Sequence, residues 1–415
     1  MVQLPAIFTE KTRLLMGEER FERYLQSFEE EPPVSIRLNP MKASPNLSKG
    51  REFQVLDGER VPWCRHAYYL KKRPNFTMDP LFHAGCYYVQ EASSMFLDEV
   101  LRQYSPLLLE GSGEALDMCA APGGKSTLLR SALPKDCVLY SNEPIRNRAN
   151  ILLENVTKWG YENHLVTNNY PKDYRKSKLM FDLILCDVPC SGEGMFRKDE
   201  ATIREWSPQN VEKCWQLQRD IVDDAWACLN AGGLLIYSTC TFNTKENEEN
   251  IRYFLEQYDD MEVVPINIQP EWNITGSLLE GFHEPVYHFI PGISRGEGLF
   301  MCVLRKSLPP TPSKRRGRQE ALNILTSDIS HHTSDIRVDL DYKSAISYLR
   351  GEALVLPEDT PRGEVTVCFQ GHPLGPMKNI GSRANNLYPK EWRIRTTHIP
   401  NEYEAILRHT EQNTD

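Results

Sequence analysis

Between about residue 90 and residue 305, apolar residues come in short runs separated by longer stretches with helical spacing. The first runs predict strands at Ala115–Met118, Val138–Asn142, Leu165–Asn168, Leu183–Asp187 and Leu234–Ser238. Helices fit between and after them at 124–132, 145–159, 208–229 and 244–257. Strands that alternate with helices build a parallel sheet covered by helices. We therefore predict an α/β domain with a doubly wound, Rossmann-like sheet. The later runs Val286–Ile290 and Leu299–Leu304 would add antiparallel strands at its edge.

The pattern changes on both sides of this domain. Residues 8–30 have apolar side chains at helical spacing, with Thr9 as a plausible cap, and Val34–Leu38 then alternates like a strand. Beyond a basic, proline-rich stretch at Pro309–Arg318, residues 340–395 alternate short apolar runs with Gly and Pro turns. We expect a small N-terminal α+β unit and a β-rich C-terminal unit. The predicted division is 1–85, 86–306, a linker at 307–335, and 336–415.

Composition narrows the class of protein. With 415 residues the chain is too long for one compact core, and no apolar run approaches the ~18 residues that span a bilayer. The first residues lack an apolar signal-peptide core, so we expect a cytoplasmic protein with no membrane contact. The eleven cysteines contain no C-x-x-C pair, which favours free thiols over disulfides or a metal site. The net charge of −9 argues weakly against a nucleic-acid partner, although local basic faces stay possible.

One loop has the composition of a nucleoside site. Asp117 to Thr127 follows a predicted strand and opens a predicted helix. Its small residues let a ligand approach the backbone, and the helix start offers free N–H donors. Glu143 follows the next strand, where a carboxylate can accept hydrogen bonds from a ribose. The residues predicted to hold the ligand are Cys119, Ala120, Ala121, Pro122, Gly123, Gly124, Lys125 and Glu143.

The loop 117–127 also has two other interpretations. It nearly matches the phosphate-binding pattern G-x-x-x-x-G-K-[ST] of a triphosphatase, but Cys119 occupies the first glycine position and Pro122 lacks an N–H donor. A plain glycine turn between strand and helix is the simplest interpretation of the loop by itself. The spacing to Glu143 favours a nucleoside pocket over both.

Two cysteines follow two of the predicted strands. Cys190 comes after the strand Leu183–Asp187, and Cys240 comes after Leu234–Ser238. If both strands are parallel members of one sheet, both cysteines emerge at the edge that carries the nucleoside loop. Most cysteines in proteins are simply buried. We therefore predict that the following cysteines are buried core residues rather than site residues: Cys64, Cys86, Cys137, Cys186, Cys214, Cys228, Cys302 and Cys368.

Three segments together resemble the RNA cytosine-5 methyltransferases of the Nol/Nop/Sun family. They read Cys-Ala-Ala-Pro-Gly-Gly-Lys at 119–125, Asp-Val-Pro-Cys-Ser-Gly at 187–192 with Glu193 and Gly194 after it, and Ser-Thr-Cys-Thr at 238–241. Flanking matches occur at Glu31–Asn39, Gln90–Met95 and Gly296–Gly298. The resemblance covers about residues 1–306 and is closest to bacterial members that modify 16S ribosomal RNA in the small subunit. It implies an RNA substrate and S-adenosylmethionine as methyl donor.

The resemblance also implies roles for individual residues. Cys240 would be the nucleophile, and Cys190 would assist release of the product. Asp187 would contact both the target base and the methyl donor. The chemistry is consistent, because a thiolate that adds to carbon 6 of cytosine makes carbon 5 able to accept a methyl group. Chemistry alone would also allow the two cysteines to exchange roles. The loop 119–125 and Glu143 would hold the methyl donor.

One departure and one weaker resemblance complete the analysis. Many relatives have an aspartate at the end of the third core strand, where this chain has Asn168 and Asn169. The C-terminal segment resembles a PUA-like RNA-binding domain, and Tyr388 and Trp392 lie among basic residues that suit phosphate contact and base stacking. An ordinary solvated β surface with buried aromatics is the alternative there. Further candidate phosphate contacts are Arg197, Lys198, Arg204 and the segment 314–318.

Three other functions stay open at this point. The target could be transfer RNA or DNA, which a panel of substrates would separate from ribosomal RNA. A triphosphatase would hydrolyse nucleotides and ignore S-adenosylmethionine. A non-catalytic RNA-binding assembly factor would keep its function after Cys240→Ala.

Overall fold

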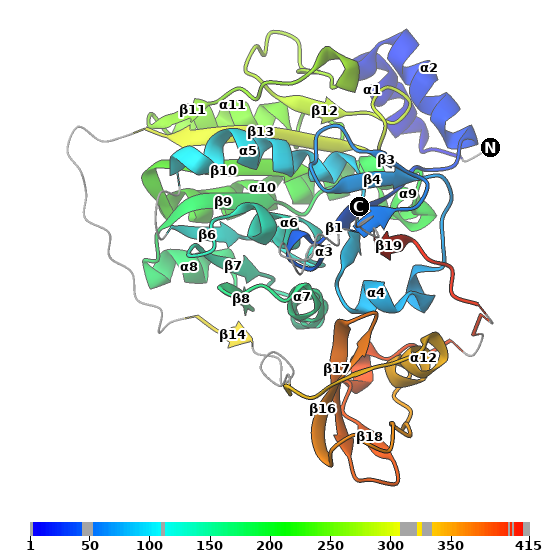
Figure 1. Cartoon of the computed structure of the whole chain (residues 1–415). Helices are drawn as coiled ribbons and strands as arrows, with labels where there is room; N and C mark the ends of the chain where they lie inside the picture. The colour runs from blue at the N-terminus through cyan, green and yellow to red at the C-terminus, as the bar shows by residue number, and fades with distance from the viewer. Residues whose placement is uncertain are drawn as a thin grey trace, which may run out of the picture.

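The chain folds into a large part around one central sheet and a smaller C-terminal part below it in the view of Figure 1. The computed structural model describes residues 3–43, 53–108, 113–307, 322–325, 334–396, 399–400 and 402–409. Within these ranges no helix is long and apolar enough to cross a membrane. The predicted basic phosphate contacts at 314–318 lie outside the described residues.

The N-terminal segment forms two helices, α1 (Ala6–Met16) and α2 (Glu18–Gln26), where the sequence predicted one. Gly17 separates them with a φ of 76°, a left-handed conformation that ends the helical path. Thr9 is not a cap, because α1 begins after Pro5 and the Thr9 hydroxyl donates to the Pro5 carbonyl from inside the helix. The single-helix prediction was therefore wrong at this glycine.

An antiparallel sheet with the strand order β3–β4–β1–β5 follows the two helices. Its strands are β1 (Val34–Leu38), β3 (Gly58–Arg60), β4 (Ala67–Leu70) and β5 (Tyr87–Val89). Short elements beside it are α3 (Pro40–Ala43), β2 (Phe53–Val55) and α4 (Pro80–His83). The predicted strand at Val34–Leu38 is confirmed.

The central sheet has the strand order β11–β13–β10–β9–β6–β7–β8–β14, with β12 paired to β13. Its parallel strands are β6 (Glu114–Asp117), β7 (Val138–Asn142), β8 (His164–Thr167), β9 (Phe181–Asp187) and β10 (Leu229–Thr239). Its antiparallel strands are β11 (Met261–Val263), β12 (Tyr287–Phe289), β13 (Leu299–Lys306) and β14 (Ile324–Leu325). The doubly wound sheet is confirmed, and its strand order reverses at β6.

Helices cover both faces of this sheet because alternate strand residues are apolar on each face. On one face α5 and α6 pack against strand residues such as Leu185 and Ile236, and on the other α8, α10 and α11 pack against residues such as Ile184 and Tyr237. The helices are α5 (Leu97–Leu108), α6 (Gly124–Ala132), α7 (Arg146–Trp159), α8 (Pro171–Ser177), α9 (Glu200–Glu205), α10 (Pro208–Ala227) and α11 (Glu248–Gln257). The predicted helices lie here, although α11 begins at Glu248 rather than at 244.

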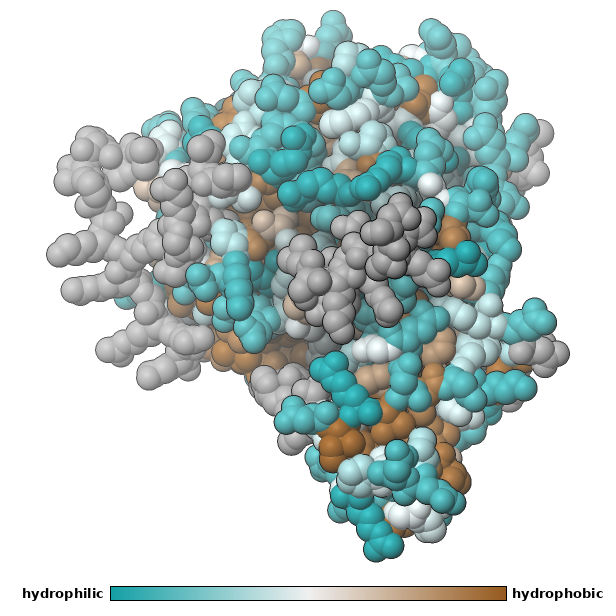
Figure 2. Space-filling model, viewed as in Figure 1, coloured by the Kyte–Doolittle hydropathy of each residue, from teal (hydrophilic) through white to brown (hydrophobic). Residues whose placement is uncertain are grey.

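The C-terminal unit is β-rich, as the sequence predicted. It contains β15 (Arg337–Asp339), α12 (Tyr342–Leu349), β16 (Gly363–Phe369), β17 (His372–Asn379) and β18 (Ala384–Asn386), with the sheet order β15–β16–β17–β18. Its core is continuous with that of the N-terminal sheet, since Ile36 and Leu81 belong to the same buried cluster as Ile346 and Val367. Figure 2 shows apolar surface in the lower part of the view, where this unit lies.

Two short strands attach the C-terminal unit to the rest of the chain. Before the unit, β14 pairs with β8 at the edge of the central sheet. After it, β19 (Leu407–His409) pairs with β2 beside the N-terminal sheet. The strand β14 falls inside the predicted linker 307–335, so this part of the linker is paired in the structure rather than free in solvent.

Candidate active site

The loop between β6 and α6 crosses the carboxyl edge of the sheet at the point where the strand order reverses. Ligands of open α/β sheets bind at such a reversal. Gly123 has a φ of 117°, and α6 begins at the next residue. The first N–H groups of a helix have no carbonyl partner within it, so this loop presents donors to a ligand.

Asp117, the last residue of β6, supplies an unpaired acceptor beneath the loop. Its Oδ2 accepts a hydrogen bond from the Ser126 hydroxyl, whereas its buried Oδ1 has no hydrogen-bond partner among the described residues. Burial raises the pKa of Asp117 to about 7, with a smaller contribution from the charge of Asp187, although the hydrogen bond from Ser126 opposes this effect. A buried oxygen without a partner marks a place where a bound ligand can donate a hydrogen bond.

Glu143 follows β7 at the same edge, and its carboxylate is buried. Its Oε1 accepts a hydrogen bond from the backbone N–H of Ile145 at 2.9 Å, and its Oε2 lies 3.3 Å from the guanidinium of Arg148. The side chain of Asn168 donates to the carbonyls of Glu143 and Pro144 at 2.7 and 2.9 Å. Asn168 therefore uses its amide to hold this strand end in place.

The two predicted site cysteines meet at the ends of neighbouring parallel strands, because β9 and β10 pair in register up to Asp187 and Ser238. The Sγ atoms of Cys190 and Cys240 lie 2.9 Å apart, and the backbone N–H of Cys240 donates to Cys190 Sγ at 3.2 Å. The hydrogen bond to Cys240, together with burial, raises the pKa of Cys190 well above that of a free cysteine. Cys190 is thus held as a thiol beside the Cys240 sulfur.

An ion pair joins the cysteines to the nucleoside loop. Lys125 Nζ, from the start of α6, lies 2.9 Å from Asp187 Oδ2, at the end of β9. Burial alone would lower the pKa of Lys125, but the carboxylate of Asp187 raises it overall, and Cys240 adds to this effect. The structure therefore brings together the predicted residues of both motifs, and a positive charge stands near the cysteine pair.

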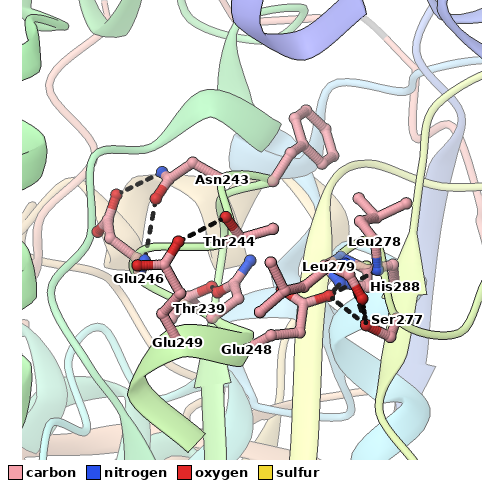
Figure 3. Close-up of polar contacts among 12 residues, drawn as sticks. Thr239, Asn243, Thr244, Glu246, Glu248, Glu249, Ser277, Leu278, Leu279 and His288 are labelled. Atoms are coloured by element: carbon pink, nitrogen blue, oxygen red, sulfur yellow. Dashed lines mark hydrogen bonds and ion pairs between the residues drawn. The ribbon is translucent and has the colours of Figure 1, made fainter. Parts of the chain in front are cut away.

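Sequence reasoning missed two buried glutamates that contact the cysteine loops. Glu193 accepts hydrogen bonds from the backbone of Phe242 and Asn243, and Glu246 accepts one from the backbone of Ser191. Figure 3 shows Asn243 and Glu246 joined by hydrogen bonds at the start of the segment that leads to α11. Glu193 belongs to the segment that carries the family resemblance, but no role was assigned to it. Glu246 lies in the predicted helix 244–257, where nothing in the local pattern indicated a buried contact.

Aromatic residues of the N-terminal helices cover the same loops. Tyr24 packs edge-to-face on Phe242, with ring centroids 5.5 Å apart, and Phe8 packs on Phe196 at 4.9 Å. The buried cluster that contains these rings also includes Ile203 of α9. The N-terminal unit therefore supports the cysteine loops from behind, in addition to any contact with a substrate.

Several predicted contacts have a different environment in the structure. Arg197 is buried and ion-paired with Glu297 at 2.7 Å, so its prediction as a phosphate contact was wrong. Tyr388 is buried at 3% exposure in the core of the C-terminal unit, so it is not available for base stacking. Lys198 and Arg204 are exposed.

The cysteines outside the site follow the prediction closely. All eleven are free thiols, and the eight assigned to the core are buried except Cys214, which is partly exposed. Among the described residues, no group of three or more His, Cys, Asp or Glu side chains could hold a metal ion.

The chain matches three family models. Residues 107–305 match 16S rRNA methyltransferase RsmB/F, residues 4–92 match the N-terminal domain of 16S rRNA methyltransferase RsmF, and residues 336–394 match the methyltransferase RsmF PUA domain. A ribosomal RNA small subunit methyltransferase F from Erwinia tasmaniensis is 27% identical over 93% of this chain and 96% of its own. One from Serratia proteamaculans is 30% identical over 76% of this chain and 67% of its own. A solved methyltransferase homolog from Pyrococcus horikoshii is similar with a TM-score of 0.59 and 28% identity, over 74% of this chain and 96% of that one.

Proposed function

The chain belongs to the RsmB/F family of 16S rRNA methyltransferases, and from that membership we propose that it methylates carbon 5 of a cytosine in 16S ribosomal RNA through a covalent cysteine–cytosine intermediate. It is an S-adenosylmethionine-dependent RNA methyltransferase, as its family is. The observation that carries the covalent mechanism is the pair of sulfur atoms 2.9 Å apart at the ligand-binding edge of the sheet.

The residues at the β6–α6 edge fit S-adenosylmethionine, which supplies the methyl group when bound. The free N–H groups at the start of α6 and the unpaired Oδ1 of Asp117 can bind polar atoms of S-adenosylmethionine. Glu143 follows the next strand, where its carboxylate can accept hydrogen bonds from the hydroxyls of the ribose. The left-handed Gly123 lets the loop approach the ligand closely. These residues orient the donor toward the neighbouring strands β9 and β10.

The cysteine pair performs the covalent steps. The Cys240 thiolate adds to carbon 6 of the cytosine, which makes carbon 5 nucleophilic so that it takes the methyl group. A base then removes the carbon 5 proton, and the electron pair of that C–H bond restores the ring double bond as the carbon 6–sulfur bond breaks. The two sulfur atoms lie within hydrogen-bond distance, so one cysteine can donate a proton to the other as the adduct breaks down. The family resemblance assigns Cys240 as the nucleophile and Cys190 as the residue that assists product release.

Asp187 and Lys125 stand beside this pair. The Asp187 carboxylate at the end of β9 can accept a hydrogen bond from the exocyclic amine of the target base as electrons move into the ring. The cytosine must leave its stack to reach the thiolate, which costs a few kcal/mol in a duplex and less if it is already unpaired.

Tritiated S-adenosylmethionine tests the proposal, with ribosomal RNA, small subunits and transfer RNA from cells that lack this protein as substrates. Wild type, Cys240→Ala and Cys190→Ala are compared, with Cys214→Ala as a matched control because Cys214 is a partly exposed cysteine outside both loops. We expect labelled 5-methylcytosine with wild type and Cys214→Ala, and none with Cys240→Ala. Cys190→Ala should accumulate a protein–RNA adduct that survives denaturation.

The other outcomes are equally informative. If Cys190→Ala abolishes transfer while Cys240→Ala traps the adduct, the two roles are reversed. Label that enters transfer RNA alone would keep the enzyme class and discard the ribosomal target.

A further inference from the structure

We propose that Glu193 and Glu246 are positioning residues that fix the separation of the two catalytic cysteines, each glutamate holding the loop of the other cysteine, an inference that rests on the proposed covalent mechanism. The two cysteines belong to different loops on neighbouring strands. Beyond the last paired residues the main chain links the two loops where the Gly194 N–H donates to the Cys240 carbonyl at 2.9 Å. The contacts of the two glutamates add side-chain restraints on both sides of this link.

Glu193 belongs to the loop of Cys190 but binds the loop of Cys240. Its Oε2 accepts hydrogen bonds from the backbone N–H groups of Phe242 and Asn243, both at 2.9 Å. Its Oε1 accepts a hydrogen bond from Trp206 Nε1 at 3.0 Å, which anchors the carboxylate. The main chain that follows Cys240 is therefore held by an acid from the other loop.

Glu246 makes the reciprocal contact. It follows Cys240 along the chain, and its Oε2 accepts a hydrogen bond from the backbone N–H of Ser191 at 3.0 Å. The same oxygen accepts from Gln218 Nε2 at 2.8 Å, and Gln218 Nε2 also donates to the carbonyl of Pro189 at 2.9 Å. The residues on both sides of Cys190 are thus restrained through Glu246 and its partner.

Asn243 connects the two carboxylates. Its Nδ2 donates to Glu193 Oε1 at 3.1 Å and to Glu246 Oε1 at 2.7 Å, and its Oδ1 accepts from the backbone of Glu246. Figure 3 shows the Asn243–Glu246 contacts. A direct contact between the hydroxyls of Ser191 and Thr241, at 2.9 Å, adds to the link between the loops.

Glu193 and Glu246 are buried without a cationic partner in the part of the chain that the structure describes. Glu193 is 2% exposed and Glu246 is fully buried, and neither forms an ion pair within the described ranges. Burial raises the pKa of Glu246, and the charge of Glu193 raises it further, although hydrogen bonds from Ser191 and Asn243 oppose this effect. Burying a carboxylate without a counter-ion is costly, and here hydrogen bonds from N–H groups of both loops offset that cost.

The chemistry of the contacts explains why carboxylates occupy these positions. Every group that faces either side chain is an N–H donor, and a carboxylate is an acceptor at both oxygens. A glutamine of the same shape would turn an NH2 group toward one set of donors. Glu→Gln substitutions therefore remove the restraint with a minimal change of volume.

The two substitutions should affect different steps of the reaction. Glu246→Gln releases the loop of Cys190, the residue that assists product release, so the denaturation-resistant adduct with RNA should increase about tenfold over wild type. Glu193→Gln releases the loop of the nucleophile, so the rate of adduct formation should fall about tenfold and no adduct should accumulate. For both variants kcat should fall while the KM for RNA changes little.

The experiment measures adduct by denaturing gel and 5-methylcytosine by nucleoside analysis, with full-length protein, tritiated S-adenosylmethionine and the RNA substrate. Glu248→Gln is the matched control, because Glu248 is a fully buried acid of the neighbouring helix α11 that contacts His288 and Leu278 instead of the cysteine loops (Figure 3). It should lower the melting temperature and leave the fraction of adduct unchanged. If Glu246→Gln does not fold, Gln218→Met replaces it, and its adduct should also increase. If Glu193→Gln does not fold, Trp206→Phe replaces it, and its adduct formation should slow.

The outcomes separate the two proposals. Opposite adduct phenotypes for the Glu193 and Glu246 variants support the positioning role. If both variants lose stability like Glu248→Gln and keep the wild-type adduct fraction and kcat, the positioning role is overturned although the covalent mechanism stands. If wild type makes no 5-methylcytosine and Cys190→Ala traps no adduct, the proposed function itself has failed.

Discussion

The carboxyl edge of the central sheet has two halves that are built in different ways. In the half that follows β6 and β7, main-chain features shape the site: a left-handed glycine, the start of a helix and a strand end. In the half that follows β9 and β10, side chains shape it: two cysteines, two buried acids and the asparagine between them. A pocket that binds the methyl donor can be built largely from main-chain groups. A site that must hold two sulfur atoms close together also uses side-chain contacts between its loops.

The largest expected effect comes from breaking the ion pair that joins the halves. Lys125→Met leaves the Asp187 carboxylate without its partner and removes a positive charge near the Cys240 sulfur. We expect kcat to fall about 100-fold, or about 3 kcal/mol, and the Kd for S-adenosylmethionine to weaken by a smaller factor, because Lys125 also belongs to the loop predicted to hold the donor. Single-turnover rates and calorimetric binding measure the two quantities, and Lys125→Arg, which keeps the charge, serves as control. A loss confined to donor affinity would assign Lys125 to the first half alone.

The second prediction concerns the pH dependence of stability in the first half. Burial raises the pKa of Asp117 to about 7 in the folded protein, so between about pH 4 and pH 7 the folded state binds more protons than the unfolded chain. The free energy of unfolding must therefore fall as pH rises through this window. Asp117→Asn abolishes this loss, and the variant should gain on the order of 4 kcal/mol relative to wild type between pH 4 and pH 8.

Urea unfolding at several pH values measures the difference. Asp98→Asn is a control of opposite sign: although burial alone would raise the pKa of Asp98, its hydrogen bonds and ion pair with Arg65 lower it. The stability deficit of that variant should therefore grow as pH rises toward about 4 and stay constant above it, because the pKa of Asp98 is lowered in the folded protein. If the difference in the free energy of unfolding between Asp117→Asn and wild type does not change with pH, burial does not raise the pKa of Asp117.

The third prediction tests the main-chain character of the first half. Gly123→Ala forces an L side chain into a φ of 117° and brings its Cβ to 3.2 Å from Leu152 Cδ1. We expect a loss of about 1–2 kcal/mol in stability and a weaker Kd for S-adenosylmethionine. Gly276→Ala is the control, because no atom lies within 4 Å of its added Cβ. Equal donor affinity in both variants would contradict the assigned role of the loop.

The smallest expected effect concerns Arg148 at the rim of the first half. Its side chain is 48% exposed and lies 3.3 Å from Glu143. Exposed ion pairs contribute little, so Arg148→Ala should cost less than about 0.5 kcal/mol by thermal unfolding. A larger loss would show that the Glu143 side chain depends on Arg148 to keep its place at the strand end.

Local patterns predicted the first half better than the second. The strands and the helix start follow from apolar runs and small residues, and each depends on neighbours in sequence. The break at Gly17 was missed because one glycine within a helical pattern is tolerated in many helices. The links made by Glu193 and Glu246 were missed because their partners are backbone N–H groups of another loop, which side-chain periodicity does not reveal. The strands β14 and β19 were missed because each is short and pairs with a distant segment.

The attachment of the C-terminal unit at two points has a consequence for how it engages a ligand. Pairing of β14 with β8 and of β19 with β2 restrains the unit at both of its ends. A module held in this way loses little rotational entropy when it docks, in contrast to one that hangs from a single tether. A long polymer that touches the C-terminal unit would meet the carboxyl edge of the central sheet at a high effective concentration, so two individually weak contacts would add up to strong avidity.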